Sequence, residues 1–569
     1  MKLLLSAFSF FLAPALAVTA NTKDQYHLRD DDHIGPAMWV FGDEGLKIYS
    51  PDGKSLRKST SAERVCHETS GYRGSTEVTL SCSFYDVVSD GKKFVWAAVS
   101  RGSSKIDVFS IDTGDIVGSF ETCNTPRDLE YHPLRDEMWV RCLGVTENEV
   151  SYMDVFSVQS PTVDSTTRIL MSDNTTDNSY GYMAIDNTMG DVGYTTMWGS
   201  PFLYKIGLSE KVVLEKFDIE LAHGGYELAY SPVNQHIFVR ALTCCTCGFE
   251  GADLGVDCGR YGTELVNITT GPSAGQNNVD GQCGRCDGSV ADTLGVYEFD
   301  TNAETFVGKH LMEDGLGGDP FASPDGKYIV MFGRNGGRSV RVLEAGNPGK
   351  VSTVAFDIKL DFNTTSVEDD AVFNDFAFIQ DGEREMIVLA SGNENKLVLI
   401  DPKSSNPSTS YISFRDGDIS SDGTRRQVEW AVGTNYVWVD GADASEVYII
   451  DVGTKQVVET LTNVNSTKMV FVQNYERTRL QNMITGESGF GSDSSSTERA
   501  FGANYEDDND IDAVGIISLI LATVALAVGV VNLVVMKNRK PQSHGQPTSS
   551  INTSSKMDEE VSLGSKNVA

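Results

Sequence analysis

The sequence predicts an all-β fold, a β-propeller of seven or eight blades with eight favoured, followed by one C-terminal transmembrane helix. Three observations lead to this prediction. A unit of four short apolar strands recurs along residues 37–474. The two ends of that region carry complementary fragments of one unit. An uncharged apolar run follows at 513–536, and it is long enough to cross about 30 Å of hydrocarbon as a helix.

Composition bounds the class of protein before any motif is considered. The chain has 569 residues, of which 46 are basic and 80 acidic, so its net charge is −34. With 40% hydrophobic residues it can bury a large core and is not disordered. The acidity argues against nucleic-acid binding, because phosphates would be repelled. We find no dinucleotide fingerprint, P-loop, HExxH or GxSxG motif, so composition and motifs name no activity.

The N-terminus has the pattern of a secretory signal. Lys2 precedes an apolar stretch, and Ala15-Leu16-Ala17 fits a cleavage site with small residues. The predicted span at 513–536 is preceded by acidic residues and followed by Lys537-Asn538-Arg539-Lys540. Because basic flanks stay in the cytosol, we expect a single-pass protein of the plasma membrane or an endomembrane, with its N-terminus outside the cytosol.

The resulting organisation has six parts in chain order. They are a signal peptide (1–17), an N-terminal segment (18–36), the propeller (37–474), an acidic flexible stalk (475–512), the transmembrane helix (513–536) and a cytosolic tail (537–569). The tail is rich in Ser and Thr and is too short for an enzymatic domain. We expect it to contact trafficking partners in the cytosol.

Each repeat begins with a short strand led by an aromatic or small residue. The leading residues are Tyr85, Tyr131, Ala184, Tyr230, Ala322, Phe378 and Trp430, spaced 46, 53, 46, 92, 56 and 52 residues apart. The long interval contains a Cys-rich insertion at 243–290. Four strands repeated every 40–50 residues are typical of a propeller. A β-sandwich array is the structural alternative, but it would not explain the complementary ends.

The ends of the repeat region predict how the ring closes. Residues 37–58 supply three strands without a leading one, and residues 468–473 supply one strand without followers. Together they make one split blade, which leaves no free sheet edge. Asp-Gly turns at 50–54, 89–93 and 323–327 supply the positive φ that tight turns need. We expect the tryptophans of second strands (Trp39, Trp96, Trp139 and Trp438) to pack between blades.

This repeat resembles the YVTN/WD-like propeller superfamily over about three quarters of the chain. The resemblance implies a fold and no particular activity. In such propellers the loops between second and third strands emerge on the face that usually binds ligands. The insertion lies between 236–242 and 293–299, so it is placed to cover or extend that face.

Ten cysteines lie in the predicted ectodomain, where disulfides are the default. They are Cys66, Cys82, Cys123, Cys142, Cys244, Cys245, Cys247, Cys258, Cys283 and Cys286. Cys66 with Cys82, and Cys123 with Cys142, are plausible local pairs. The other six lie in the insertion, which has little core and needs cross-links to hold a shape. Their CCxC and CxxC spacing also suits a metal–thiolate site, but the oxidising compartment favours disulfides.

Several other residues are candidates for binding or modification. Asp416, Asp418, Ser420 and Asp422 place oxygen atoms at alternate positions, which suits a calcium loop, although a plain acidic turn is the simpler interpretation. Sequons at Asn174, Asn267, Asn363 and Asn465 favour a glycosylated ectodomain. The histidines His67, His132, His223 and His310 fall near propeller loops, but no spacing joins them into a catalytic or metal site.

Three functions fit this layout. The first is a cell-surface receptor that binds an extracellular small molecule or protein. The order of parts, with Cys244-Cys245-Thr246-Cys247 in the ectodomain, resembles algal (diatom-type) iron-starvation-induced surface proteins. That resemblance implies capture of an iron–siderophore complex and endocytic uptake. The second is a membrane-tethered hydrolase or lactonase, and the third is an adhesion protein with calcium loops. Calcium and an iron complex are therefore the candidate cofactors.

Overall fold

The computed structural model of the chain describes residues 33–475 with gaps in connecting loops. The undescribed internal residues are 71–77, 82–83, 100–102, 124, 143–150, 160–165, 173–180, 198–199, 220–223, 243–292, 312–318, 333–338, 361–375, 382–383, 391–393, 404–406, 416–425 and 442–444. All described residues belong to one compact unit that ends at Asn504.

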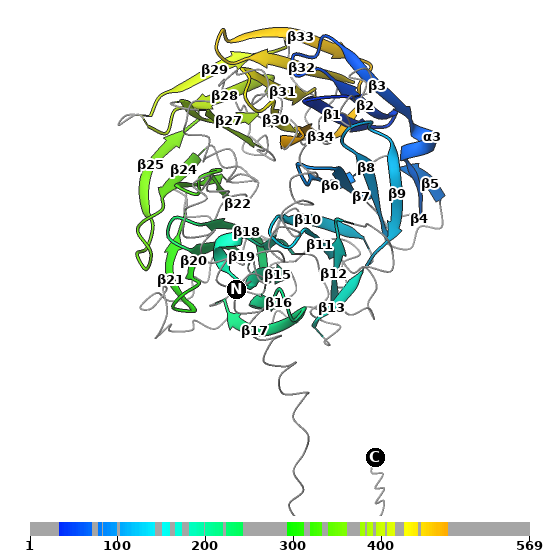
Figure 1. Cartoon of the computed structure of the whole chain (residues 1–569). Coiled ribbons are helices and arrows are strands. Elements are labelled where there is room, and N and C mark those ends of the chain that lie inside the picture. The colour runs from blue at the N-terminus through cyan, green and yellow to red at the C-terminus, as the bar shows by residue number, and fades with distance from the viewer. Residues whose placement is uncertain are drawn as a thin grey trace, which may run out of the picture. The chain divides into compact units, whose positions relative to one another are not determined.

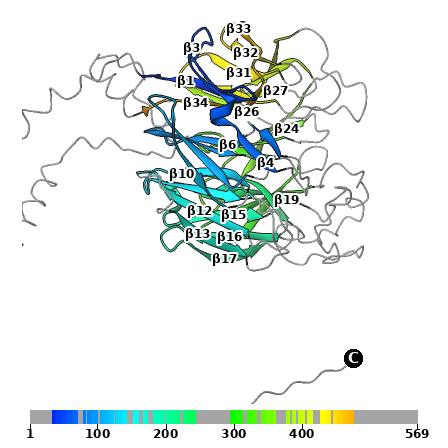
Figure 2. The same cartoon turned by 90° about the vertical axis from the view of Figure 1, so that its right-hand side faces the viewer.

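Eight four-stranded antiparallel sheets form a ring, shown down its axis in Figure 1 and edge-on in Figure 2. The prediction of eight blades is therefore confirmed. Within each sheet the strands follow one another in chain order, from the innermost to the outermost, except in the split blade. We number the blades 1 to 8 and take the split blade as blade 1.

Blades 1 to 4 contain the following strands. Blade 1 is β34 (Ser466–Val472), β1 (Ala37–Gly42), β2 (Gly45–Tyr49) and β3 (Leu56–Ser61). Blade 2 is β6 (Phe84–Ser89), β7 (Phe94–Val99), β8 (Lys105–Ser110) and β9 (Ile116–Glu121). Blade 3 is β10 (Pro126–His132), β11 (Glu137–Cys142), β12 (Ser151–Ser157) and β13 (Thr167–Ser172). Blade 4 is β14 (Met183–Ala184), β15 (Val192–Met197), β16 (Ser200–Gly207) and β17 (Val212–Asp218).

Blades 5 to 8 repeat the same arrangement. Blade 5 is β18 (Gly224–Ser231), β19 (His236–Leu242), β20 (Thr293–Asp300) and β21 (Thr305–His310). Blade 6 is β22 (Asp319–Ala322), β23 (Tyr328–Phe332), β24 (Ser339–Glu344) and β25 (Thr353–Lys359). Blade 7 is β26 (Phe376–Asp381), β27 (Arg384–Ala390), β28 (Lys396–Ile400) and β29 (Thr409–Ser413). Blade 8 is β30 (Val428–Trp430), β31 (Tyr436–Asp440), β32 (Glu446–Asp451) and β33 (Gln456–Thr462).

Three short elements lie outside the eight blades. The helix α3 (Ala62–Val65) and the hairpin of β4 (His67–Ser70) and β5 (Val78–Ser81) connect blade 1 to blade 2. A 3₁₀ turn, η4 (Asn187–Met189), joins β14 to β15.

The ring closes as the sequence predicted. The last strand, β34, pairs antiparallel with β1, and Trp39 lies opposite Val470 in this register. Three strands from the start of the propeller and one from its end thus complete a single sheet. In this way β1, the second strand of blade 1, gains an innermost neighbour. No second strand of the eight described blades is therefore left with an unpaired edge.

The core is divided among the joints between neighbouring blades. Each of the eight joints holds one apolar cluster, and together they contain most of the buried hydrophobic side chains. The second-strand tryptophans Trp39, Trp96, Trp139 and Trp438 are all fully buried in these clusters. The expectation that these residues pack between blades is therefore confirmed.

The Asp-Gly turns also form as expected. In the turn between β6 and β7, the Asp90 carboxylate accepts hydrogen bonds from the backbone N–H groups of Lys92, Lys93 and Phe94. Gly91 follows with a φ of +69°, a conformation that glycine adopts without a steric penalty. The turns at 89–93 and 323–327 join first to second strands, and the turn at 50–54 joins the third and fourth strands of blade 1.

Several predicted segments lie outside the described residues. They are the signal peptide, the whole 243–290 insertion, the stalk beyond 475, the span at 513–536 and the tail. Within the described part of the chain, no helix has the length and apolar character needed to cross a membrane.

Candidate functional site

The direction of the innermost strands defines two faces of the ring. Each innermost strand begins after the loop from the preceding blade and ends at the turn to the second strand. The loops between second and third strands lie on the face where the innermost strands begin, which we call the upper face. The insertion leaves from β19 and returns at β20, the second and third strands of blade 5. Its predicted position in the blade is confirmed.

Three tyrosines surround one arginine on the upper face, where the innermost strands of blades 2 to 5 begin. We call Tyr85, Arg127, Tyr182 and Tyr226 the axial cluster. The Arg127 guanidinium carbon lies 5.2 Å from the centre of the Tyr85 ring and 5.9 Å from that of Tyr182. Arg127 also donates a hydrogen bond of 3.2 Å to the Tyr226 hydroxyl. Contacts at these distances are cation–π interactions.

The axial cluster brings together blades that are consecutive in the sequence. Tyr85 comes from blade 2, Arg127 from blade 3, Tyr182 from the segment just before β14, and Tyr226 from blade 5. The Tyr182 and Tyr226 rings meet edge to face, with their centres 5.3 Å apart. Tyr85, Arg127 and Tyr182 are only half-buried. The cluster therefore combines a fixed geometry with groups that solvent, and a ligand, can reach.

Carboxylates near the cluster are used to join neighbouring innermost strands. Asp86 accepts a hydrogen bond from the Leu129 backbone N–H at 3.0 Å, and Asp128 accepts one from that of Met183 at 2.8 Å. At the joint between blades 8 and 1, Glu429 accepts a hydrogen bond from the Phe471 N–H at 3.1 Å. Innermost strands have no further strand on their axial side, so these carboxylates satisfy otherwise unpaired backbone donors.

Burial and neighbouring carboxylates raise the pKa values of two acidic groups near the cluster, Asp128 and Glu130. Burial, followed by the negative charge of Asp86, raises the pKa of Asp128 to about 7. Burial, Asp128 and Asp86 together raise the pKa of Glu130 well above its usual range. Asp128 is thus partly protonated near neutral pH. The negative charge around Arg127 is consequently smaller than the number of carboxylates would indicate.

A second arginine lies next to the cluster. Arg240 of β19 is buried, and its guanidinium carbon lies 5.3 Å from the centre of the Tyr226 ring. It forms ion pairs with Glu227, at 3.5 Å, and with Asp319 of blade 6. Because both carboxylates and Arg240 are almost fully buried, this group has a structural role that also holds the Tyr226 ring in place.

The described histidines are each engaged away from the axial cluster. His67 contacts Asp107 at 2.6 Å, His132 accepts a hydrogen bond from the Arg135 N–H, and His310 contacts Glu298 at 2.7 Å. No group of three or more metal-binding side chains occurs among the described residues. His223, which the sequence also singled out, lies outside them. The three described histidines that the sequence singled out, His67, His132 and His310, are therefore not brought together.

The structure describes only some of the predicted site residues. Cys123 and Cys142 form a disulfide with their Cα atoms 5.8 Å apart. Cys66 is also disulfide-bonded, while Cys82 and the six cysteines of the insertion lie outside the described residues. The calcium candidates at 416–422 and the sequons at Asn174, Asn267 and Asn363 lie outside them too. Asn465 is exposed in the loop before β34, where its side-chain amide donates a hydrogen bond to Asp43.

Sequence analysis did not find the axial cluster. Its members lie just before or just after the start of an innermost strand. Tyr85 is itself a recognised leading residue, and the other three lie two to four positions before the next leading residue. The signal that could have revealed the cluster is that its members occupy similar positions in consecutive repeats. Residues at the same height of neighbouring innermost strands converge on the axis of a propeller.

Comparison with known proteins assigns this chain to no family. No protein-family profile matches the chain, and no curated protein matches its sequence. Among solved structures, AztD of Citrobacter koseri is 10% identical over 77% of this chain and 98% of that one, with a TM-score of 0.47. The dihydro-heme d1 dehydrogenase NirN in complex with DHE is 10% identical over 78% and 76%, at 0.47. The β-propeller domain of Myceliophteria thermophila Cps50 (Swd1) is 9% identical over 66% and 98%, at 0.39.

The sheet topology thus identifies the chain as an eight-bladed β-propeller protein. At these identities, the likeness to other propellers concerns architecture alone.

Proposed function

We propose that this chain is a single-pass cell-surface binding protein whose propeller captures an extracellular small molecule at the axial cluster. The observation that carries the proposal is the position of Arg127 between the rings of Tyr85 and Tyr182, within reach of the Tyr226 hydroxyl. A guanidinium held against aromatic faces is pre-organised to bind a planar or negatively charged group. A ferric siderophore, which combines such groups, is the first ligand to test.

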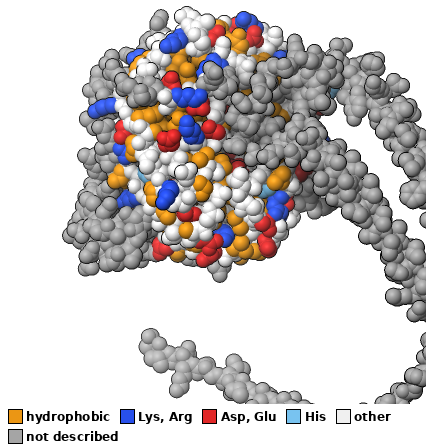
Figure 3. Space-filling view, turned by 60° about the vertical axis from the view of Figure 1, so that its left-hand side comes forward, with side chains coloured by type: hydrophobic (Ala, Val, Ile, Leu, Met, Phe, Trp, Pro, Cys, Tyr) orange, Lys and Arg blue, Asp and Glu red, His pale blue; other side chains and the backbone are white. Residues whose placement is uncertain are grey.

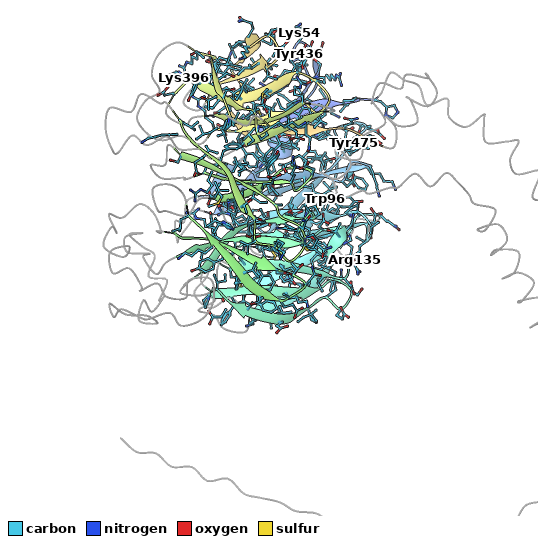
Figure 4. All side chains as sticks on the ribbon, turned by 90° about the vertical axis from the view of Figure 1, so that its left-hand side faces the viewer. Lys54, Trp96, Arg135, Lys396, Tyr436 and Tyr475 are labelled. Carbon is cyan, nitrogen blue, oxygen red and sulfur yellow. A yellow bond between two sulfur atoms is a disulfide. The ribbon has the colours of Figure 1, made fainter. Side chains whose placement is uncertain are left out.

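The path of the chain supports a receptor orientation. After β34, the Tyr475 N–H donates a hydrogen bond to the Gly91 carbonyl, in the turn between the first and second strands of blade 2. Figure 4 places Tyr475 on the same side of the ring as Arg135, and Lys396 on the other side. The chain therefore leaves on the lower face. The axial cluster thus lies on the face opposite to the one on which the described chain ends.

The surface and the cysteines agree with an extracellular location. Described side chains on the face in Figure 3 mix acidic, basic and apolar groups, without one continuous apolar patch. The Cys123–Cys142 disulfide is of the kind that persists in oxidising compartments. Both features suit a propeller that is exposed to the medium.

The test is ligand binding by the full chain, produced through the secretory pathway. Ferric siderophores, free iron, calcium and simple lactones are titrated against wild type and the Arg127→Ala variant, and binding is followed by thermal shift. We expect one planar anionic ligand to raise the melting temperature of wild type, with affinity at least about tenfold weaker in Arg127→Ala. Arg135→Ala, on the lower face, is the matched control. Equal binding by both variants would contradict the proposal.

A further inference from the structure

The carboxyl group of Asp128 is tied to two members of the axial cluster. Along β10 its residue directly follows Arg127, and its Oδ2 accepts a hydrogen bond of 2.8 Å from the backbone N–H of Met183, which directly follows Tyr182. Asp128 is half-buried, as Arg127 and Tyr182 are. The carboxyl group is therefore held beside side chains that would bind a ligand, and solvent can reach it.

Two other carboxyl groups act on Asp128. They are Asp86 of β6 and Glu130 of β10. Burial, followed by the charge of Asp86, raises the pKa of Asp128 to about 7. Asp128 therefore changes its charge near neutral pH, whereas an ordinary aspartate is already ionised there.

Positive charge reaches Asp128 from two arginines. Arg127 of β10 and Arg141 of β11 favour its ionised form, but less strongly than burial and Asp86 oppose it. Arg141 is fully buried, and its Nη1 already donates to three oxygen atoms of blade 3. The neighbouring strand β7 has no ionisable side chain, and β14 contributes the uncharged N–H of Met183. Arg127 is therefore the guanidinium that Asp128 and an incoming ligand would share.

We propose that the axial cluster binds an anionic ligand together with one proton, which Asp128 takes up from solvent. This inference rests on the function proposed above and specifies the charge chemistry of its ligand. An anion that is seated on Arg127 repels an ionised Asp128 but not a protonated one. The coupling is reciprocal, so ionisation of Asp128 weakens anion binding by the same factor by which the anion favours its protonation.

This coupling fixes the direction of the pH dependence. In the free chain Asp128 loses its proton near pH 7, and with an anion beside it the proton is lost only at higher pH. Affinity for the anion should therefore be greatest at pH values below the pKa of free Asp128, and it should fall as the pH rises through that value. For charges several ångströms apart near a protein surface, the expected fall is on the order of tenfold.

The direction has a consequence for release of the ligand. An anion would be held more tightly in an acidified compartment than at neutral pH, so acid alone would not release it. Release would require a change in the ligand itself, such as the loss of its negative charge.

Benzoate, a planar anion that keeps its charge between pH 6 and 8, is the probe, and neutral benzamide is its control. Binding to the full chain is measured by isothermal titration calorimetry at pH 6, 7 and 8 and constant ionic strength. Two buffers with different ionisation enthalpies reveal how many protons are taken up. In wild type we expect benzoate affinity to fall on the order of tenfold from pH 6 to 8, with uptake of a fraction of a proton at pH 7. Benzamide affinity should not change.

Two variants remove the two charges in turn. Asp128→Asn keeps an acceptor for the Met183 N–H and cannot ionise, so its benzoate affinity should be the same at pH 6 and 8, without proton uptake. Asp86→Asn keeps an acceptor for the Leu129 N–H and removes the charge that raises the pKa of Asp128. Its fall in affinity should therefore begin at lower pH, which tests the proposal even if Asp128→Asn does not fold.

Asp191→Asn is the matched control, because it removes a partner of Arg135 on the lower face and should behave like wild type. Equal benzoate affinity of wild type at pH 6 and 8, or a fall that survives in Asp128→Asn, would overturn the uptake of a proton. Failure of the proposed site is a different result, in which Arg127→Ala binds benzoate as tightly as wild type at pH 6. No benzoate binding at any of the three pH values would overturn both proposals.

Discussion

Lys468 of β34 lies 3.5 Å from Asp86 of β6, measured from Nζ to Oδ1. The other carboxylate oxygen of Asp86 accepts the hydrogen bond from the Leu129 N–H in β10. One carboxylate therefore connects the innermost strands of blades 1, 2 and 3. Because β34 is the last strand of the ring, this ion pair adds to the backbone pairing with β1 that closes it.

If β34 closes the ring, removing the charge of Lys468 should destabilise the fold much less than removing the whole strand β34. Lys468→Met should lower the free energy of unfolding by about 1 kcal/mol, since a half-buried ion pair contributes little more. A chain that ends at Asn465 lacks β34 and leaves β1 unpaired, so it should fail to be secreted as a folded protein. Thermal unfolding and secreted yield measure the two effects, with Lys468→Arg as the conservative control. A truncated chain that melts like wild type would contradict this account of closure.

The blade joints predict a large cost for losing a tryptophan. Trp96 is fully buried in the cluster between blades 2 and 3, so Trp96→Ala should lower the free energy of unfolding by about 3–5 kcal/mol. The Trp96 indole N–H has no hydrogen-bond partner among the described residues. Trp96→Phe removes that unsatisfied donor and should therefore cost less than Trp96→Ala.

Denaturant unfolding measures these costs. Leu134→Ala is the control, because Leu134 is 71% exposed and its loss should change the free energy by less than about 0.5 kcal/mol. Equal effects of Trp96→Ala and Leu134→Ala would show that the apolar clusters between blades do not stabilise the fold.

The fold could be predicted because its signals are local. Alternating apolar residues, Asp-Gly turns and a leading residue such as Tyr85 or Trp430 all fall within one repeat, and each repeat forms one blade. Even the closure of the ring followed from the missing strands at its ends. The topology confirms these elements because a strand pairs with the next strand along the chain in all blades but one.

The axial cluster and the setting of Asp128 depend on contacts between blades. Arg127 and Tyr226 are 99 residues apart, and Asp128 and Met183 are 55 apart. No local pattern records such a contact, and buried polar side chains break the apolar alternation that marks a strand. In β10, for example, Asp128 looked like an ordinary polar position in a strand. The predicted calcium loop and the insertion stay predictions, because they lie outside the described residues.

The disulfide predicts a loss of stability without a loss of fold. Cys123 lies in the loop between blades 2 and 3, and Cys142 ends the second strand of blade 3 opposite Pro126. The bridge closes a loop with a sequence separation of 19, which corresponds to about 3 kcal/mol of stabilisation. Replacing both cysteines with Ala should lower the free energy of unfolding by about that amount, as measured by denaturant titration without reductant.

The control for this variant is a single replacement that keeps the bridge. Ser151→Ala, near the start of the next strand, removes a hydrogen bond from Arg141 but leaves both cysteines. If the double cysteine variant unfolds at the same denaturant concentration as wild type, the bridge does not stabilise the joint.

The axial carboxylates predict that stability falls as pH rises from about 4 to about 7. Because burial and Asp86 raise the pKa of Asp128 to about 7 in the folded chain, the folded state binds a proton that the unfolded state releases near pH 4. Stability is therefore greatest below that range and declines through it. Asp128→Asn keeps an acceptor for the Met183 N–H and cannot ionise.

Asp128→Asn should make this decline shallower and should leave the variant more stable than wild type at pH 8. Thermal unfolding between pH 4 and 8 measures both effects. Asp115→Asn is the control, because a hydrogen bond from Lys58 lowers the pKa of Asp115 and keeps that group ionised throughout the range. A slope that is unchanged in Asp128→Asn would mean that burial and the charge of Asp86 do not act on this carboxyl. In that case Arg127 would face fully ionised neighbours, and a negatively charged ligand would be a poor match for the axial cluster.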